Sequence, residues 1–123
     1  MSNYNRWVLL EHKGAPNDPS GCHFDLLIED GCDGCRTWRL MKIPVIGDCP
    51  QEIKPLPLHN IRWLETQKED LSRGRGSVQR LVLGHFVGEL PKDSNSALRL
   101  ELHSSELSGV LEIENGFYKL NPL

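Results

Sequence analysis

Residues 23–29, HFDLLIE, alternate in polarity as a β-strand does. One face, expected to build the core, carries Phe24, Leu26 and Ile28, and the other carries His23, Asp25, Leu27 and Glu29. His23 and Asp25 point the same way with Cα atoms roughly 6.5 to 7 Å apart, so both can reach one metal ion. Imidazole with carboxylate suits manganese, iron or zinc when part of the coordination shell stays open. The alternative interpretation is a half-exposed strand whose polar face binds nothing.

The residues on either side of this stretch also have the pattern of β-strands. Residues 6–11 are rich in β-forming side chains, with Trp7 and Leu9 on one face and Val8, Leu10 and His12 on the other. Residues 13–21 form a loop by their glycine and proline content. The turn DGCDGC, residues 30–35, joins the central strand to a second strand over 36–41 as a hairpin.

The sequence pattern of the second half of the chain predicts further short strands. Four prolines make residues 42–58 irregular, residues 59–64 are a candidate strand, and the charged stretch TQKEDLSRGRG is an exposed loop. Strands are then expected over residues 77–83, 85–90, 97–102, 109–114 and 117–120. No stretch has a convincing helical period. The expected fold is therefore all-β, a small single-domain β-barrel over residues 1–123 with long irregular loops.

Composition narrows the class of protein. A chain of 123 residues has room for one domain, and 38% hydrophobic with 25% charged residues excludes disorder. A net charge of −3 gives no overall basic field, so contact with nucleic acid needs a local group of Arg and Lys. The first residues lack a signal-peptide pattern and no apolar run approaches the roughly 18 residues of a membrane span. We expect a cytoplasmic protein with no membrane contact.

The four cysteines leave two interpretations open. They are Cys22, Cys32, Cys35 and Cys49. In a reducing compartment they are thiols or metal ligands rather than disulfides. The Cys32-x-x-Cys35 pair could contribute to a four-thiolate zinc site, although the other two spacings fit no common zinc ribbon.

From residue 7 to residue 44 the chain resembles the 3'-phosphoesterase domain of bacterial DNA ligase D and its free-standing relatives. That family has a hydrophobic strand ending in His, a short loop, H-[YF]-D-[LF]-R-L-E, a turn, and then S-W-A-V-P-K-G-P. Here the strand runs to His12, HFDLLIE follows a longer loop, and TWRLMKIP occupies residues 37–44. The resemblance continues weakly to the C-terminus and implies the same β-barrel.

The resemblance also implies a site. His12, His23 and Asp25 match the family's ligands for manganese, with zinc or another divalent ion as alternatives. His59 matches a further active-site histidine, a candidate proton donor or phosphate ligand. Candidate phosphate or substrate contacts are Lys42, Trp63, where the family has Tyr, and Arg75 in a glycine-rich turn.

Two departures from the family affect this site. The Arg of the family's H-[YF]-D-[LF]-R is Leu27 here, and a second family Arg aligns with Gln51. Leucine cannot grip a phosphate as a guanidinium does. Arg39, on the neighbouring strand, is a candidate replacement.

These residues leave two functions open. The resemblance implies a manganese-dependent phosphoesterase, a hydrolase acting on 3'-phosphate ends of DNA or RNA in DNA repair, with a ligase or polymerase as partner in trans. The loss of the family Arg at Leu27 favours the alternative, a catalytically impaired barrel that binds phosphate-bearing nucleic-acid ends or a protein partner. The sequence does not decide between enzyme and binding module.

Overall fold

The computed structural model describes residues 5–31, 34–93 and 95–123. The strands are β1 (Arg6–Lys13), β2 (Cys22–Glu29), β3 (Cys35–Leu40), β4 (Gln51–His59), β5 (Lys68–Asp70), β6 (Ser77–Val87), β7 (Leu98–His103), β8 (Gly109–Glu114) and β9 (Phe117–Asn121). A single 3-10 turn, η1 (Ile61–Leu64), precedes β5, and the described residues contain no α-helix. The predicted all-β class is confirmed. Over the same residues, no helix has the length and apolar character needed to cross a membrane.

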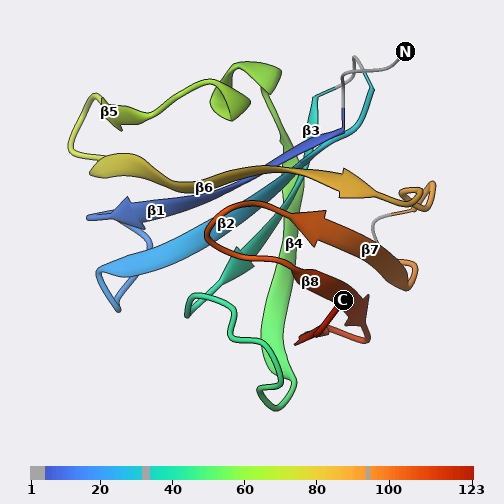
Figure 1. The fold of residues 1–123 in the computed structure, drawn as a ribbon. Helices are drawn as coiled ribbons and strands as arrows, with labels where there is room; N and C mark the ends of the chain where they lie inside the picture. The colour runs from blue at the N-terminus through green and yellow to red at the C-terminus, as the bar shows by residue number, and fades with distance from the viewer. Residues whose placement is uncertain (1–4, 32–33, 94) are drawn as a thin grey trace.

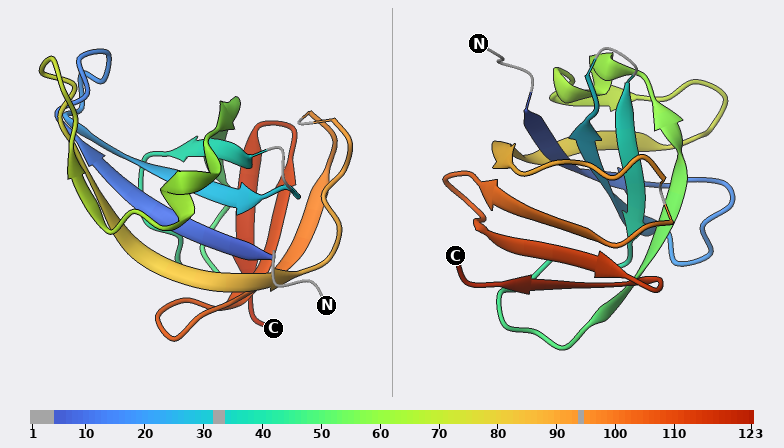
Figure 2. Two further views of the ribbon diagram at one scale, coloured as in Figure 1. Left: turned by 90° about the horizontal axis from the view of Figure 1, so that it is seen from above. Right: turned by 90° about the vertical axis from the view of Figure 1, so that its right-hand side faces the viewer.

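The strands form one antiparallel sheet that closes in a ring (Figures 1 and 2). Its order is β1-β2-β3-β4-β9-β8-β7-β6-β5, and an additional β1–β6 pairing joins the two sides. β5 pairs with the first residues of β6 and stands outside the ring. The β1–β2 pairing sets His12 directly opposite His23, because the two strands run antiparallel from Trp7↔Ile28 to Lys13↔Cys22.

Two apolar clusters bury both faces of β2. The larger one takes side chains from all eight ring strands, including Phe24, Leu26 and Ile28, and therefore lies between them. The smaller one covers the other face and consists of Val8, Leu10, Leu27, Cys35, Leu64 and Val78. The strand face carrying His23 is thus buried rather than half-exposed.

The prediction that residues 42–58 are irregular was wrong for β4, despite Pro55 and Pro57. The backbone N–H of Ile53 donates to the Gly116 carbonyl on the β9 side of the strand at 2.9 Å. Alternation places the nitrogen of Pro55 on that same side. The β4–β9 pairing includes only Gln51 and Glu52, so Pro55 lies on a free edge, while Pro57 lies where the β3–β4 register shifts between Leu56 and His59.

Three other boundaries differ from the sequence prediction. Residues 59–64 are not a strand, because His59 ends β4 and the Asn60 side chain caps η1 by accepting a hydrogen bond from the Arg62 N–H at 2.9 Å. The exposed loop expected around residue 69 contains the short strand β5. The two strands predicted on either side of Gly84 are one, β6; a Cβ there would lie 2.1 Å from the His103 carbonyl oxygen, so this glycine marks a close backbone approach and not a turn.

Candidate metal centre

His12, His23 and Asp25 form one compact group. Each offers one ligand atom, and these atoms lie within 4.8 Å of one another. Strand pairing places His12 opposite His23, with ring centroids 4.8 Å apart, and Asp25 follows on the same face of β2. Within the described ranges no other group of three or more His, Cys, Asp or Glu residues is close enough to share an ion.

The hydrogen bonds of His23 point one ring nitrogen into this group. Its side chain is fully buried, and Nδ1 lies 2.8 Å from Oδ2 of Asp18. A carboxylate accepts here, so Nδ1 carries a proton, and in the neutral imidazole Nε2 then keeps its lone pair. Nε2 lies 3.5 Å from Oδ1 of Asp25, and both atoms are buried without a hydrogen-bond partner. Two buried acceptors facing each other fit a shared cation, which would satisfy both.

Asp18 is a site residue that the sequence reasoning missed. It lies in the loop between β1 and β2, where its Oδ1 accepts a hydrogen bond from the Ser20 N–H at 3.0 Å. Hydrogen bonds from the Ser20 hydroxyl and from His23 lower the pKa of Asp18 to about 2, so the carboxylate stays ionised near neutral pH. The sequence signal is the Asp-Pro-Ser-Gly turn just before His23, a pattern in which the Asp side chain accepts a hydrogen bond from the backbone two residues further on.

His12 is held by a different loop. Its Nε2 lies 2.9 Å from the carbonyl oxygen of Arg75, which leaves Nδ1 as the candidate ligand atom when Nε2 carries the proton. The Arg75 guanidinium bonds instead to the Ser72 carbonyl at 3.0 Å and to its hydroxyl at 3.1 Å. Gly76 lets this loop reach β1, since a Cβ there would lie 1.9 Å from the Lys13 carbonyl oxygen. Arg75 thus enters the site through its backbone.

Leu27, which replaces the family arginine, and Arg39, the candidate substitute for it, have different surroundings. Leu27 is fully buried in the smaller apolar cluster. Arg39 lies directly opposite Asp25 in the β2–β3 pairing and shares its face. The Nε atom of Arg39 is buried without a hydrogen-bond partner. The structure therefore places a cationic residue of β3 directly opposite one of the candidate metal ligands.

The remaining candidates lie elsewhere or are already paired. His59 is paired with Cys35 of β3, and Cys35 is paired with Glu29 of β2. Glu29 is six residues from His23, so His59 lies roughly 20 Å from His23 along the strand direction. Trp63 packs on the smaller apolar cluster, with the Arg62 guanidinium 4.2 Å from its ring centroid. Lys42 follows β3, and its ammonium lies 2.7 Å from the Asp48 carboxylate.

The cysteines do not converge on one ion. Cys22 begins β2 and Cys35 begins β3 opposite Glu29, so these two thiols lie at opposite ends of the β2–β3 hairpin. Cys32 lies outside the described residues. Burial raises the pKa of the Cys35 thiol to about 11, which keeps it protonated near neutral pH. A four-thiolate zinc site that includes both Cys22 and Cys35 is therefore excluded.

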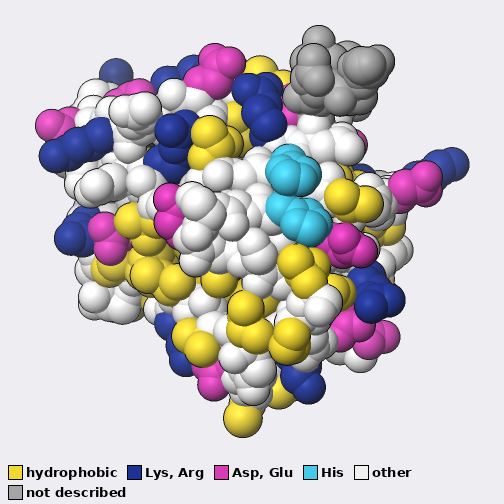
Figure 3. Space-filling model, viewed as in Figure 1, with side chains coloured by type: hydrophobic (Ala, Val, Ile, Leu, Met, Phe, Trp, Pro, Cys, Tyr) yellow, Lys and Arg dark blue, Asp and Glu magenta, His cyan; other side chains and the backbone are white. Residues whose placement is uncertain are grey.

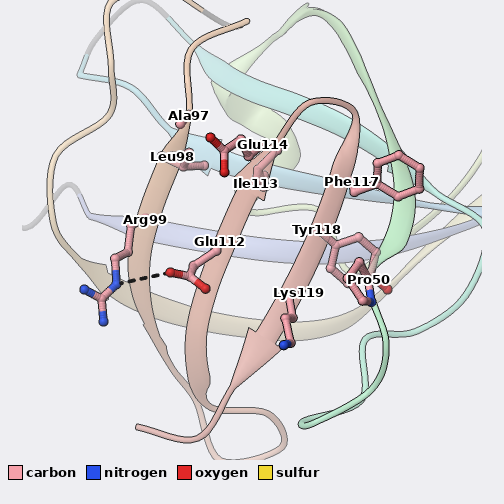
Figure 4. Close-up of a pocket in the computed structure, with 10 residues that line it drawn as sticks. All are labelled: Pro50, Ala97, Leu98, Arg99, Glu112, Ile113, Glu114, Phe117, Tyr118 and Lys119. Carbon is pink, nitrogen blue, oxygen red and sulfur yellow. Dashed lines mark ion pairs between the residues drawn. The ribbon is translucent and has the colours of Figure 1, made fainter.

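A hollow of about 390 Å³ lies apart from this centre, over β7, β8 and β9 (Figure 4). Its charged lining includes the Arg99–Glu112 ion pair at 3.7 Å, and none of the three candidate ligands lines it. Basic and acidic side chains are interspersed over the face shown in Figure 3. Because the net charge of the chain is −3, contact with a phosphate ester has to rest on a local group such as the one around Arg39.

No family model matches this chain, and a search of curated proteins finds no significant match. Fold and site define its class: an all-β protein whose ring-closed antiparallel sheet carries a two-histidine, one-carboxylate group able to hold a metal ion.

Proposed function

We propose that this chain is a divalent-metal-dependent phosphoesterase, built on a β-barrel, that acts on 3'-phosphate ends of DNA or RNA in DNA repair. The observation that carries the proposal is the facing pair of buried, unpartnered atoms, Nε2 of His23 and Oδ1 of Asp25. The resemblance over residues 7–44 supports the reaction class. Manganese is the proposed ion, with zinc or another divalent ion as alternative, because imidazole and carboxylate together suit these metals.

His12, His23 and Asp25 would hold the ion, which when bound supplies Lewis-acid polarisation of a phosphoryl oxygen. Asp18 fixes the tautomer and ring orientation of His23. Arg39 lies one strand away from Asp25, where its guanidinium can bind a phosphoryl oxygen and offset negative charge that grows in the transition state. We assign His59 no part in this chemistry because of its distance along the sheet.

The second candidate is a module that binds 3'-phosphorylated ends without turnover. Its specific support is the absence of the family arginine together with the position of His59, since both remove groups that would assist phosphoryl transfer. The metal group and Arg39 would then serve recognition alone.

The test is phosphate release from a 3'-phosphorylated primer–template, with and without manganese. We expect release that requires manganese and is lost in His23→Ala. The matched control is His85→Ala, because this exposed histidine of β6 stacks on His103 away from the candidate ligands. Metal-bound protein that retains the oligonucleotide but releases no phosphate would favour the binding module. Release that survives His23→Ala would contradict the proposed site.

A further inference from the structure

One outer face of the sheet continues from the candidate ligands across three more strands. Strand pairing sets Asp25 opposite Arg39 and Arg39 opposite Lys54, so these side chains form a row across β2, β3 and β4. A second row lies beside it, because Glu52 precedes Lys54 by two residues on the same face of β4 and is opposite Phe117 of β9. His23 begins this second row on β2.

The first row places two cations side by side. Cross-strand neighbours have Cβ atoms about 4.5 to 5.5 Å apart, and like charges at this distance destabilise a sheet unless an anion lies between them. In the described part of the chain neither Arg39 nor Lys54 enters an ion pair. Nε of Arg39 also lacks a hydrogen-bond partner. The Arg39–Lys54 end of the row therefore has the composition of an anion site, and Asp25 at the other end belongs to the metal centre.

The second row is apolar at its far end. Two adjoining hollows, of about 290 and 200 Å³, share Met41 and Glu52 in their linings. The first is also lined by Arg39 and Lys54, and the second by Phe117. Met41 and Phe117 are 55% and 46% exposed, which is unusual for side chains of this size and provides a platform for a flat apolar group. Figure 4 shows the Phe117 ring beside β4.

Resting on the proposed function, we propose that this face is a groove for the last nucleotides of a single strand. The 3' end lies at the metal group, the phosphodiester joining the last two nucleotides lies on Arg39 and Lys54, and the terminal base packs on Met41 and Phe117. Glu52 repels phosphate from the second row and so assigns the phosphodiester to the first. Groups recognised beyond the terminal phosphate would make a nucleic-acid end, rather than a small phosphate monoester, the substrate class.

The test measures binding without turnover. A fluorescent single-stranded oligonucleotide with a 3'-hydroxyl has no terminal phosphate to release, so anisotropy titrations on it are independent of catalysis. Lys54→Ala should reduce the magnitude of the slope of log K against log salt by about 0.7, the effect of one lost phosphate contact on a single strand. Phe117→Ala should raise Kd about fivefold or more. The Phe117→Ala effect should vanish on an oligonucleotide whose last nucleotide is abasic.

Matched controls are Lys68→Ala on β5 and Val87→Ala on β6, which remove an exposed cation and an exposed apolar side chain away from the groove. Absence of binding, an unchanged salt slope in Lys54→Ala, or a Phe117→Ala effect that persists on the abasic strand would each overturn the groove. Phosphate release with none of these binding effects would support the proposed phosphoesterase activity and overturn the proposed groove. The binding effects without phosphate release would support the proposed groove and overturn the proposed phosphoesterase activity.

Discussion

The Nδ1 atom of His23 lies 2.8 Å from Oδ2 of Asp18, and this contact directs the opposite ring nitrogen toward Asp25. A carboxylate behind a ligating histidine fixes its tautomer and raises its basicity. Loss of such a partner typically costs 10- to 100-fold in metal affinity.

Asp18→Ala should therefore weaken manganese binding by about 10- to 100-fold while leaving the fold intact, measured by calorimetric titration and circular dichroism. The matched control is Asp93→Ala. Asp93 accepts a hydrogen bond from the backbone N–H two residues ahead at 3.0 Å, as Asp18 does, but in a loop away from the ligands. Equal metal affinity in Asp18→Ala and wild type would show that Asp18 serves the loop and not the site.

Leu27→Arg should destabilise the protein rather than supply the family's missing phosphate contact. Leu27 is fully buried among apolar side chains, and an unpaired charge placed there costs about 3 to 5 kcal/mol. Leu27→Met, which keeps the volume, should cost less than about 1.5 kcal/mol. Urea unfolding measures both. A stable Leu27→Arg protein with increased phosphate release would mean that this face opens to solvent.

Gly76→Ala should disturb the metal centre although Gly76 is not itself a candidate ligand. A Cβ at residue 76 would lie 1.9 Å from the Lys13 carbonyl oxygen, so the loop that brings the Arg75 carbonyl to His12 must move. Gly74→Ala is the matched control, because φ is also positive there, +68° against +89°, but nothing lies within 4 Å. We expect Gly76→Ala to lose at least about 1 kcal/mol more stability than Gly74→Ala, and to bind manganese more weakly. Identical behaviour of the two variants would contradict this packing.

Alkaline pH should destabilise the fold in two windows. Burial raises the pKa of Cys35 from 9.0 to about 11, so the folded thiol keeps a proton that the unfolded chain has lost. The free energy of unfolding should then fall as pH rises from 9 to 11, by up to about 1.4 kcal/mol per pH unit. Burial raises the pKa of Tyr118 from 10.0 to about 12, which adds a fall above pH 10.

Urea unfolding at pH 8 to 11 separates the two groups. Cys35→Ala should flatten the fall between pH 9 and pH 10, and Tyr118→Phe should flatten only the part above pH 10. A pH dependence that neither substitution changes would show that these two groups do not titrate differently in the folded and unfolded chains.

Local periodicity explains what could be predicted from sequence. The two-residue repeat of β2 determines that His23 and Asp25 share a face, and the all-β class follows from the repeated short strands. Asp18 and the Arg75 carbonyl could not be predicted, because both reach the site through loops that return to β1 and β2. β4 could not be predicted because Pro55 argues against a paired strand. Proline is tolerated there only because the β4–β9 pairing is incomplete and leaves that edge of β4 free, which the sequence does not show. The burial of Leu27 depends likewise on Leu64, far along the chain.

Manganese titration of wild type, His23→Ala and His85→Ala is the direct test of the candidate metal centre. We predict one manganese ion per wild-type chain, no measurable binding in a His23→Ala protein that circular dichroism shows to be folded, and wild-type binding in His85→Ala. No saturable binding to the wild type, or equal binding to all three proteins, would contradict a metal centre at His12, His23 and Asp25.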